Sequence, residues 1–506
     1  MLAQFDALTT WTSPSIDFHA FAPEIIVVAT ISLLILLDLF GGERNKWTQP
    51  SVAGIGLLVA GIPIVTLAYD GVDRVLFGGG YVVDDFALVL KALFVISGYV
   101  VVLISTNYIA EGDYWEGEYY QLILSSVLGM MVMASARDLV SIFVALELLS
   151  IPAYMLAAWR KRDLKSNEAG LKYYLMGVFA SAILLYGMSL LYGLTGSTLL
   201  RDIGEHVRNL PEGRPLVALA IVFVIVGFAF KVSAVPFHTW APDTYEGAPT
   251  PVTAFLAVAS KAAGFVAIVT LVFVGFYDSA GADVYEPVFF VLSLVTMTVG
   301  NLIALRQTNV VRLMAYSGIA QAGYIMAPLA IAGVSLQAGE TALQAIVMYL
   351  LIYAAMNLGA FAVIIAVARK TRSAELESYG GLFQYAPGLA VAMTIFLFSL
   401  AGIPPLAGWF GKFVIFRALV EPGTTPGYVL AVAVGLNSVI ALFYYARIAR
   451  QMWMEDAPLG DRSPIRVPVS LNAALAITVV VTIVLGVAPY LVTRLTENVT
   501  LLGIGT

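Results

Sequence analysis

Long apolar runs recur along almost the whole chain, and each is long enough to cross a lipid bilayer. A helix needs roughly 20 mainly apolar residues to span the hydrocarbon core. We expect about fourteen such helices with short loops between them, which makes the chain an all-α integral membrane protein with a single domain over residues 1–506. The expected spans cover residues 23–40, 50–69, 86–106, 118–136, 138–158, 168–196, 215–235, 251–276, 286–306, 310–333, 341–369, 388–420, 427–449 and 470–494.

Composition supports the membrane class and excludes several kinds of site. The chain is 60% hydrophobic and 12% charged, whereas about 25% of the residues in a soluble domain are charged. It has no cysteine, which excludes thiolate ligation of zinc or iron–sulfur clusters by this chain. The three histidines, His19, His206 and His238, are far apart in sequence. We therefore expect no metal and no cofactor in this chain, and no nucleic-acid partner.

The basic residues predict the orientation. Odd-numbered loops hold 15 of the 27 Lys and Arg residues, even-numbered loops and the C-terminus hold 7, and 5 lie inside spans. Because loops rich in Lys and Arg stay on the cytoplasmic side, the odd loops are expected inside. Both termini then lie on the outer side, which requires an even number of spans and agrees with fourteen.

Arginines stand only near the ends of the expected spans and are counted with the loops, whereas five lysines stand farther inside. A charge at mid-bilayer costs about 2.5–3.5 kcal/mol even on the lenient insertion scale. Lysine can lose its proton when it is desolvated and arginine effectively cannot, so lysine suits a proton carrier. The five are Lys91, Lys172, Lys231, Lys261 and Lys412.

These lysines differ in depth. Lys91 is about five residues into its span, so we expect its long stem to snorkel to the interface. Lys172 is near the cytoplasmic end of its span, where a structural and a functional reading are equally open. The other three are deeper, and for them a functional role is favoured over a purely structural ion pair.

Glu147 is an acid near the middle of the span over residues 138–158. Nine helical residues from Asp138 place it about 14 Å deep, close to the midplane. A lone buried carboxylate would stay protonated. Paired with a buried lysine, it can share a proton, and each partner then sets the pKa of the other.

Two spans carry helix breakers beside the deep lysines. One contains Lys231 followed by Pro236 and Trp240, and the other contains Pro405 and Trp409 followed by Lys412. A proline frees a backbone carbonyl, which lipid tolerates only where protein or a wet cavity satisfies it. Paired interrupted helices indicate inverted repeats around an ion site.

The order of the spans agrees with such a repeat. Spans four to eight and nine to thirteen form two blocks of five, and an odd number of spans makes consecutive blocks run in opposite directions. The interrupted helix is the fourth in each block. We therefore divide the domain into helices 1–3 (residues 1–117), a first repeat (118–276), an inverted second repeat (286–449) and a last helix (470–494).

Four stretches of this sequence resemble the antiporter-like membrane subunits of respiratory complex I. They are Lys231–Phe255, Ala259–Phe265, Asn357–Phe361 and Ser399–Phe413. The likeness extends over nearly the whole chain. Within the first stretch, Asp243–Pro251 is similar to one of the three kinds of these subunits in particular.

The resemblance implies a fold of fourteen core helices with two inverted five-helix repeats, each holding a broken helix. It also makes Lys231 the partner of Glu147. The residues that match the proton relay of the family are Glu147, Lys231, Lys261 and Lys412, with Lys172 and His238 as secondary candidates.

The function implied is proton translocation in the inner membrane of a bacterium. NADH, FMN, iron–sulfur clusters and quinone are then expected in partner subunits, which supply the energy, and the chain is not expected to work alone. From the residues alone, three alternatives stay open: a subunit of a multi-subunit Na⁺/H⁺ antiporter, a subunit of a membrane-bound hydrogenase-type complex, and a structural spacer whose lysines only pair.

Overall fold

The chain folds into a bundle of membrane-length helices. The structure, a computed structural model, describes residues 16–41, 47–112, 117–209, 215–277 and 279–501. Within these ranges, 11 helices are long and apolar enough to cross a membrane, and two shorter apolar helices accompany them. The chain is therefore an all-helical protein of many spans, as the sequence predicts.

Nine of the long helices are regular. They are α1 (Ala22–Gly41), α2 (Thr48–Asp70), α3 (Asp85–Ala110), α5 (Leu139–Ala157), α6 (Leu164–Thr195), α12 (Ser279–Ala304), α14 (Leu336–Thr371), α18 (Thr425–Met454) and α19 (Val469–Val487). Two separate helices lie where the fourth and fifth spans are expected, because α4 (Gly117–Ser135) ends before Asp138, whose side chain accepts hydrogen bonds from the first turn of α5.

The other two long helices are composite. One runs through α10 (Thr250–Phe255), η2 (Leu256–Ser260), α11 (Lys261–Thr270) and η3 (Leu271–Gly275), with η2 and η3 wound as π-helix. The other joins α13 (Val310–Met326) to the 3₁₀ segment η4 (Ala327–Val334).

The run over residues 388–420 is interrupted as expected and forms two helices, α16 (Pro387–Ala401) and α17 (Ala407–Val420). The run over 470–494 differs from its expected form, because it is divided into α19 and the short α20 (Tyr490–Thr496). In both cases a proline follows the end of the first helix, and the residue before a proline avoids helical geometry. The span that begins at Pro215 ends as α8 at Lys231 and is followed by the short α9 (Trp240–Gly247).

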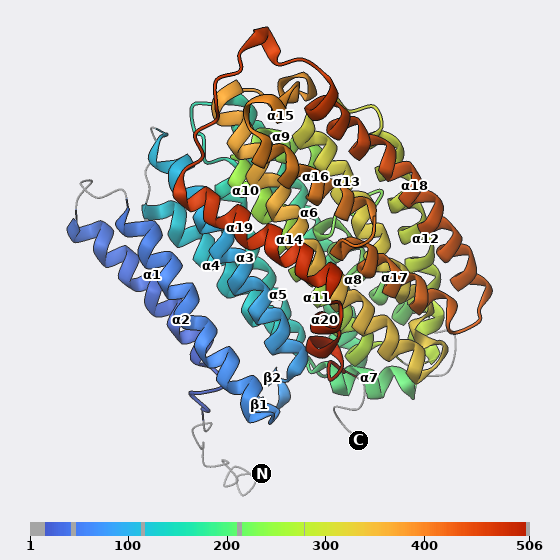
Figure 1. The fold of residues 1–506 in the computed structure, drawn as a ribbon. Helices are drawn as coiled ribbons and strands as arrows, with labels where there is room; N and C mark the ends of the chain where they lie inside the picture. The colour runs from blue at the N-terminus through green and yellow to red at the C-terminus, as the bar shows by residue number, and fades with distance from the viewer. Residues whose placement is uncertain (1–15, 42–46, 113–116, 210–214, 278, 502–506) are drawn as a thin grey trace, which may run out of the picture.

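Small elements at the helix ends were not predicted. Strands β1 (Arg74–Leu76) and β2 (Tyr81–Val83) form an antiparallel hairpin across the turn η1 (Phe77–Gly79). The amphipathic helix α7 (Leu200–Arg208) lies at the same end of the molecule (Figure 1). Further short turns are η5 (Leu376–Tyr379), α15 (Leu382–Tyr385) and η6 (Pro458–Gly460).

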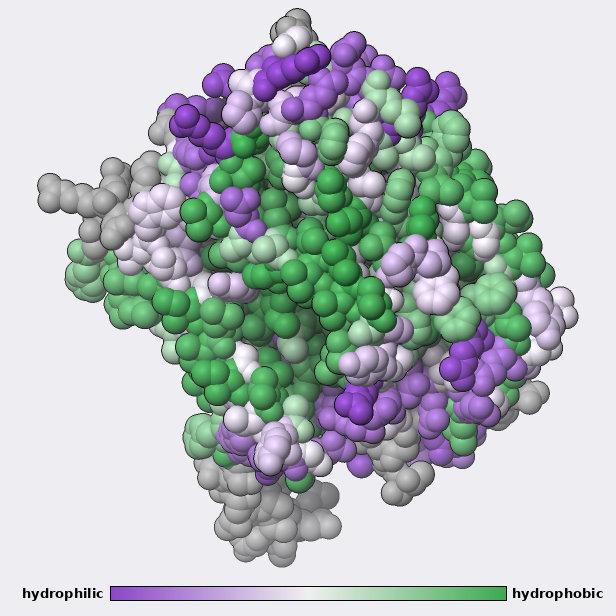
Figure 2. Space-filling model, in the orientation of Figure 1, coloured by the Kyte–Doolittle hydropathy of each residue, from purple (hydrophilic) through white to green (hydrophobic). Residues whose placement is uncertain are grey.

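The distribution of apolar and polar side chains on the surface is the one expected for a protein in a bilayer. Apolar side chains cover the middle of the face seen in Figure 2, and polar side chains gather at both ends. The composite helix Thr250–Gly275 and helix α14 are the most enclosed, each 94% buried over its most apolar window, whereas α1 and α19 are 28% buried. One of the deep lysines, Lys261, lies on this enclosed composite helix.

Candidate functional site

The two interrupted helices end in the same backbone motif. At the end of α8, Ser233 has a φ of +60°. The Ser233 N–H donates to the Phe230 carbonyl at 3.0 Å and the Ala234 N–H to the Ala229 carbonyl at 2.8 Å. This pair of bonds is a Schellman motif, which satisfies carbonyls at a helix end.

The end of α16 has the same motif, with both hydrogen bonds at equivalent positions. Gly402 has a φ of +94°, and its N–H donates to the Ser399 carbonyl at 2.9 Å. The Ile403 N–H donates to the Phe398 carbonyl at 3.0 Å. A cis proline bond follows each motif, Val235-Pro236 in the first and Pro404-Pro405 in the second.

Side chains satisfy the carbonyls that the two breaks free. The Trp240 indole N–H donates to the Phe230 carbonyl at 3.0 Å, and Lys412 Nζ donates to the Ala401 carbonyl at 2.8 Å. Gln321 Nε2 donates to the Leu400 carbonyl at 3.2 Å. The breaks are therefore lined by polar side chains inside protein, which is where lipid-embedded chains tolerate irregular backbone.

Lys231, the last residue of α8, is 3% exposed. Its Nζ donates to Ser150 Oγ at 2.8 Å and to the Tyr173 hydroxyl at 3.1 Å. Tyr173 also stacks on Trp240 with ring centroids 4.4 Å apart. Lys231 is thus held between α5, α6 and the segment that follows its own helix break.

Glu147 lies near Lys231 without a direct ion pair. Ser150 takes the position of direct partner, one helical turn further along α5, and among the described residues no ion pair of 4.0 Å or less joins Glu147 to Lys231. The Glu147 carboxylate still acts on Lys231 through space, and its Oε1 is buried without a hydrogen-bond partner in the described chain.

Lys261 lies in the most enclosed helix, directly after the π-helical turn η2, and is 2% exposed. Its Nζ donates to the Gly318 carbonyl on α13 at 2.7 Å. A Cβ atom at Gly318 would lie 3.3 Å from Lys261 Nζ and 3.1 Å from the Tyr353 hydroxyl. The bare glycine therefore lets both polar groups approach the same point of the helix.

Lys412 on α17 is 8% exposed, and its Nζ lies 5.0 Å from the centre of the Tyr324 ring. Its hydrogen bond to the Ala401 carbonyl places the ammonium at the C-terminus of α16. The exposed carbonyls of a helix C-terminus carry partial negative charge and favour a cation.

A chain of polar side chains that the sequence did not single out approaches both Lys261 and Lys412. On α13, Ser317 precedes Gly318 and hydrogen-bonds the Tyr445 hydroxyl. One turn later Gln321 donates to the same hydroxyl at 3.4 Å and accepts from Tyr349. Through its bond to the Leu400 carbonyl, Gln321 reaches the residue before Ala401. The spacing of Ser317 and Gln321, one turn apart in an apolar helix, is the signal that could have found them.

The secondary candidates are placed differently. His238 lies between α8 and α9, is half-buried, and its Nδ1 has no hydrogen-bond partner in the described chain. The Lys172 side chain is 42% exposed and contacts Glu168 at 2.6 Å and Asp243 at 2.7 Å. Lys172 therefore belongs to an ion network at a helix end and not to the buried lysines.

Arg312 extends this network from α13. Its Nη1 donates to Asp243 at 2.8 Å and to Glu246 at 2.9 Å. Burial raises the pKa of the Asp243 carboxyl. Hydrogen bonds from Lys172 and Arg312 lower this pKa by more than burial raises it, so it lies below its ordinary value of 3.8. The network ties α6, α9 and α13 together while Asp243 stays ionised at neutral pH.

The expectation that Lys91 snorkels to the interface is wrong. Lys91 is 0% exposed and forms an ion pair of 2.9 Å with Glu24 of α1, which is 1% exposed. Its Nζ also donates to the Tyr81 hydroxyl at 2.9 Å. The first turn of α1 brings an acid to α3, so the lysine is neutralised inside the protein instead of at the membrane surface.

The chain matches a known family model over more than half of its length. Residues 136–441 match the family described as NADH:quinone oxidoreductase/Mrp antiporter, TM. The chain is also 40% identical to the NADH-quinone oxidoreductase subunit N of Heliobacterium modesticaldum over 475 residues, which covers 94% of this chain and 97% of that protein. It is 39% identical to the NAD(P)H-quinone oxidoreductase subunit 2 of Gloeobacter violaceus, with 96% and 91% covered.

Chains of solved membrane complexes are also similar to this one. A chain of respiratory complex I from Thermus thermophilus with bound aureothin is 33% identical, with a TM-score of 0.76 and coverage of 93% of this chain and 98% of that one. A chain of the Mrp complex from Dietzia sp. is 22% identical, with a TM-score of 0.83 and coverage of 96% and 97%. The second likeness shows the fold alone.

Proposed function

Because the chain belongs to the subunit N family of the antiporter-like membrane subunits of NADH-quinone oxidoreductases, we propose that its buried lysines, together with Glu147, carry the protons that such a complex moves. The chain is a proton-translocating membrane subunit that needs the other subunits of its complex. The observation that supports these sites is the burial of Lys231, Lys261 and Lys412, each below 10% exposed and each held by neutral hydrogen-bond acceptors.

A lysine held by neutral partners can exchange its proton at a lower cost than one fixed in an ion pair. Lys231 has Ser150 and Tyr173 as direct partners, with Glu147 one helical turn from Ser150. An ionised Glu147 stabilises the ammonium form of Lys231 by Coulombic attraction, and protonation of Glu147 removes that attraction. The pair thus forms the loading end of the relay.

The proton then passes from Lys231 toward Lys261. The Tyr173 hydroxyl accepts a hydrogen bond from Lys231, and the side chain of Ser260 lies beside Tyr173. Ser260 is the residue that directly precedes Lys261 in the chain. His238, with its free Nδ1, is a second polar group for this step. From Lys261 the route continues past Gly318 and Gln321 to Lys412, which faces the outer exit.

The energy comes from partner subunits. Moving one charge against 100 mV costs about 2.3 kcal/mol. No group of three or more His, Asp or Glu side chains that could hold a metal occurs among the residues that the structure describes. We propose that this subunit carries no redox centre and that NADH, FMN, iron–sulfur clusters and quinone act in its partners.

The internal repeat is part of the proposal. The matched ends of α8 and α16 support it, and so does a second pair of matched contacts. Asp138 caps α5 and pairs with Leu199 after α6, while Asn309 caps α13 and pairs with Glu375 after α14. We propose fourteen membrane helices with inverted repeats over residues 118–276 and 286–449, preceded by three helices in residues 1–117 and followed by one in 470–494, with both termini outside.

The test of the relay is the Lys261→Ala variant of the intact complex. Lys261 has no acidic partner within 4.0 Å among the described residues, so the change removes the carrier without breaking an ion pair there. We expect full assembly and retained NADH oxidation with fewer protons moved per electron pair. Lys161→Ala in the exposed loop before α6 is the matched control and should pump normally. A fully assembled Lys261→Ala complex that pumps with wild-type stoichiometry would overturn the relay.

A further inference from the structure

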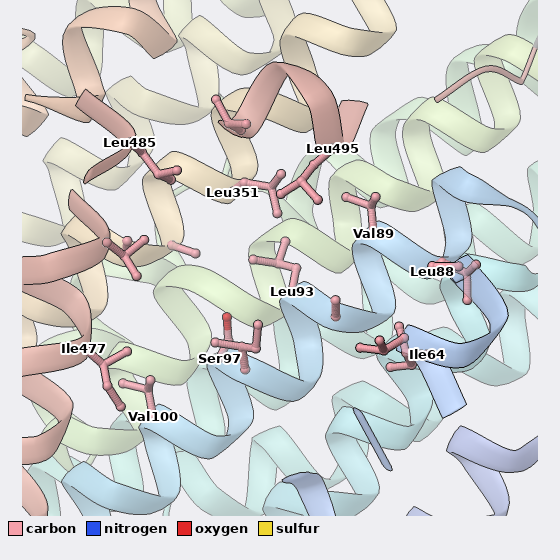
Figure 3. Close-up of a pocket in the computed structure, with 18 of the residues that line it drawn as sticks. Ile64, Leu88, Val89, Leu93, Ser97, Val100, Leu351, Ile477, Leu485 and Leu495 are labelled. Atoms are coloured by element: carbon pink, nitrogen blue, oxygen red, sulfur yellow. The ribbon is translucent and has the colours of Figure 1, made fainter. Parts of the chain in front are cut away.

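A cavity unrelated to the buried lysines lies on the membrane face of the molecule. It has a volume of about 530 Å³ and is enclosed by α2, α3, α14, α19 and α20. In Figure 3, Leu93 of α3, Leu351 of α14 and Leu485 of α19 point into the same space. Its floor is buried, with Leu93 5% and Leu358 3% exposed, whereas Val65 and Ile96 at the mouth are 69% and 58% exposed. The cavity is therefore a groove that opens to the bilayer.

The dimensions of the groove suit one acyl chain. Along α3 it runs from Asp85 to Val100, which at the α-helical rise is about 22 Å, longer than one leaflet of roughly 15 Å. An apolar cavity of about 150 Å³ holds one benzene molecule, so by volume this groove has room for roughly 20 carbon atoms. Along its length the lining is aliphatic apart from Ser97 and Thr478, and the Thr478 hydroxyl already donates to the Ala474 carbonyl at 2.8 Å.

The charges of the groove lie at one end. Asp85 in the first turn of α3 and Arg494 of α20 both line it there, together with Asn498. Within the part of the chain that the structure describes, neither Asp85 nor Arg494 has an ion-pair partner at 4.0 Å or less. One end of the groove thus offers an acid and a base, and the remainder is apolar apart from Ser97 and Thr478.

We propose that this groove binds a glycerophospholipid with an amine headgroup. Arg494 binds the phosphate, since guanidinium groups match phosphate geometry. Asp85 binds the ammonium, and an acyl chain fills the groove between α3 and α14. An anionic lipid without an amine would leave Asp85 facing a like charge.

The bound chain has a physical consequence for the bundle. The groove lies against one face of α14, through Leu351, Ala354 and Leu358, while Tyr353 and Asn357 of the same helix lie in the polar interior. Only one helix separates the groove from that interior. An acyl chain in the groove keeps water away from this face of α14.

The test uses the whole complex, purified with its native lipids. Native mass spectrometry counts the phospholipids retained, and a density map of the complex locates them. We expect a lipid in the groove with its phosphate at Arg494. In reconstitution with defined mixtures of phosphatidylethanolamine and phosphatidylglycerol, we expect Asp85→Asn to lower the preference for phosphatidylethanolamine roughly fivefold, because one charge near the surface contributes about that factor. Arg494→Gln should weaken retention of both lipids.

Two filling variants keep the proposal falsifiable. Ala92→Phe and Ala355→Phe place rings in the groove and should each remove one phospholipid per complex. Val439→Phe on the exposed face of α18 adds the same ring outside the groove and should remove none, and Arg417→Gln is the matched control for Arg494→Gln. A helix of another subunit or a quinone in the groove, or equal lipid counts in the filled and control variants, would overturn the proposal.

Discussion

At the scale of the residue, Lys91 and Glu24 form an ion pair that is hidden from both water and lipid. The two side chains are 0% and 1% exposed and 2.9 Å apart. Breaking a buried pair by removing one partner costs about 3–5 kcal/mol, because the other charge is left uncompensated. We therefore expect Lys91→Met to destabilise the attachment of α1, which packs on α2 and α4, by this amount, measured as a loss of assembled complex and a lower melting temperature.

The double variant Glu24→Leu with Lys91→Met separates charge from packing. Replacing a whole buried pair by apolar residues is often neutral or stabilising. The double variant should therefore recover most of the stability that Lys91→Met loses. If both variants are equally unstable, shape and not charge holds α1 in place.

The partners of Lys231 give a second prediction. Hydrogen bonds to charged groups contribute about 1.5–3 kcal/mol, so Ser150→Ala should make the ammonium form of Lys231 harder to keep. We expect fewer protons per electron pair, with NADH oxidation and assembly unchanged. Ser141→Ala in the first turn of the same helix is the control. Normal pumping by Ser150→Ala would exclude Ser150 as a positioning residue for Lys231.

Lys231, Lys261 and Lys412 could be predicted as buried because each stands deep in an apolar run, too far from its ends for the side chain to reach the interface. Their neutral partners could not. Ser150 is one of many small polar residues in these helices, and the acceptor for Lys261 is the backbone carbonyl of Gly318, which leaves no trace in the residue type. The burial of Lys91 could not be predicted because its partner Glu24 is 67 positions earlier in the chain, and only the packing of α1 on α2 and α4 brings Glu24 to it.

At the scale of the element, Gly402 is the residue that the break in α16 requires. Its φ of +94° is unfavourable for other residues, and a Cβ there would lie 2.9 Å from Lys412 Cδ. We expect Gly402→Ala to cost about 1–3 kcal/mol and to displace Lys412, which should lower both the melting temperature of the complex and its proton stoichiometry.

Gly435 on α18 is the matched control for Gly402. It lies inside a regular helix, and a Cβ there would meet nothing within 4 Å. Alanine is favoured over glycine in a helix by up to about 1 kcal/mol, so Gly435→Ala should be neutral or slightly stabilising. An equal loss of stability in both variants would mean that the geometry at Gly402 is not the cause.

The helix breaks at Pro236 and Pro405 were predictable because each proline stands close to a deep lysine, whereas Pro63 and Pro152 lie inside the unbroken helices α2 and α5. The helices α7 and α9 and the β1–β2 hairpin were not. These elements are too short to carry a clear periodicity, and each is held by contacts with distant segments. The Trp240 indole, for example, reaches back to Phe230, and Tyr81 pairs with Ala136.

At the scale of the whole molecule, the arrangement of basic loops predicts sidedness. The absence of cysteine makes this testable, because a single introduced thiol is the only one in the chain. Val72 in the second loop is 57% exposed, and Ser463 in the thirteenth loop is also exposed. With both termini outside, Val72→Cys should react with a membrane-impermeant maleimide in right-side-out vesicles, and Ser463→Cys only in inverted vesicles.

Partner subunits can cover either loop, so the same two variants are labelled after detergent solubilisation of the membranes, which exposes both sides. Full labelling there and no labelling from the wrong side establishes the side of each loop. An odd number of helices between Val72 and Ser463 places them on opposite sides, which fourteen spans require. Labelling of both thiols from one side would mean an even number of helices between Val72 and Ser463, and it would overturn the proposed count of fourteen spans.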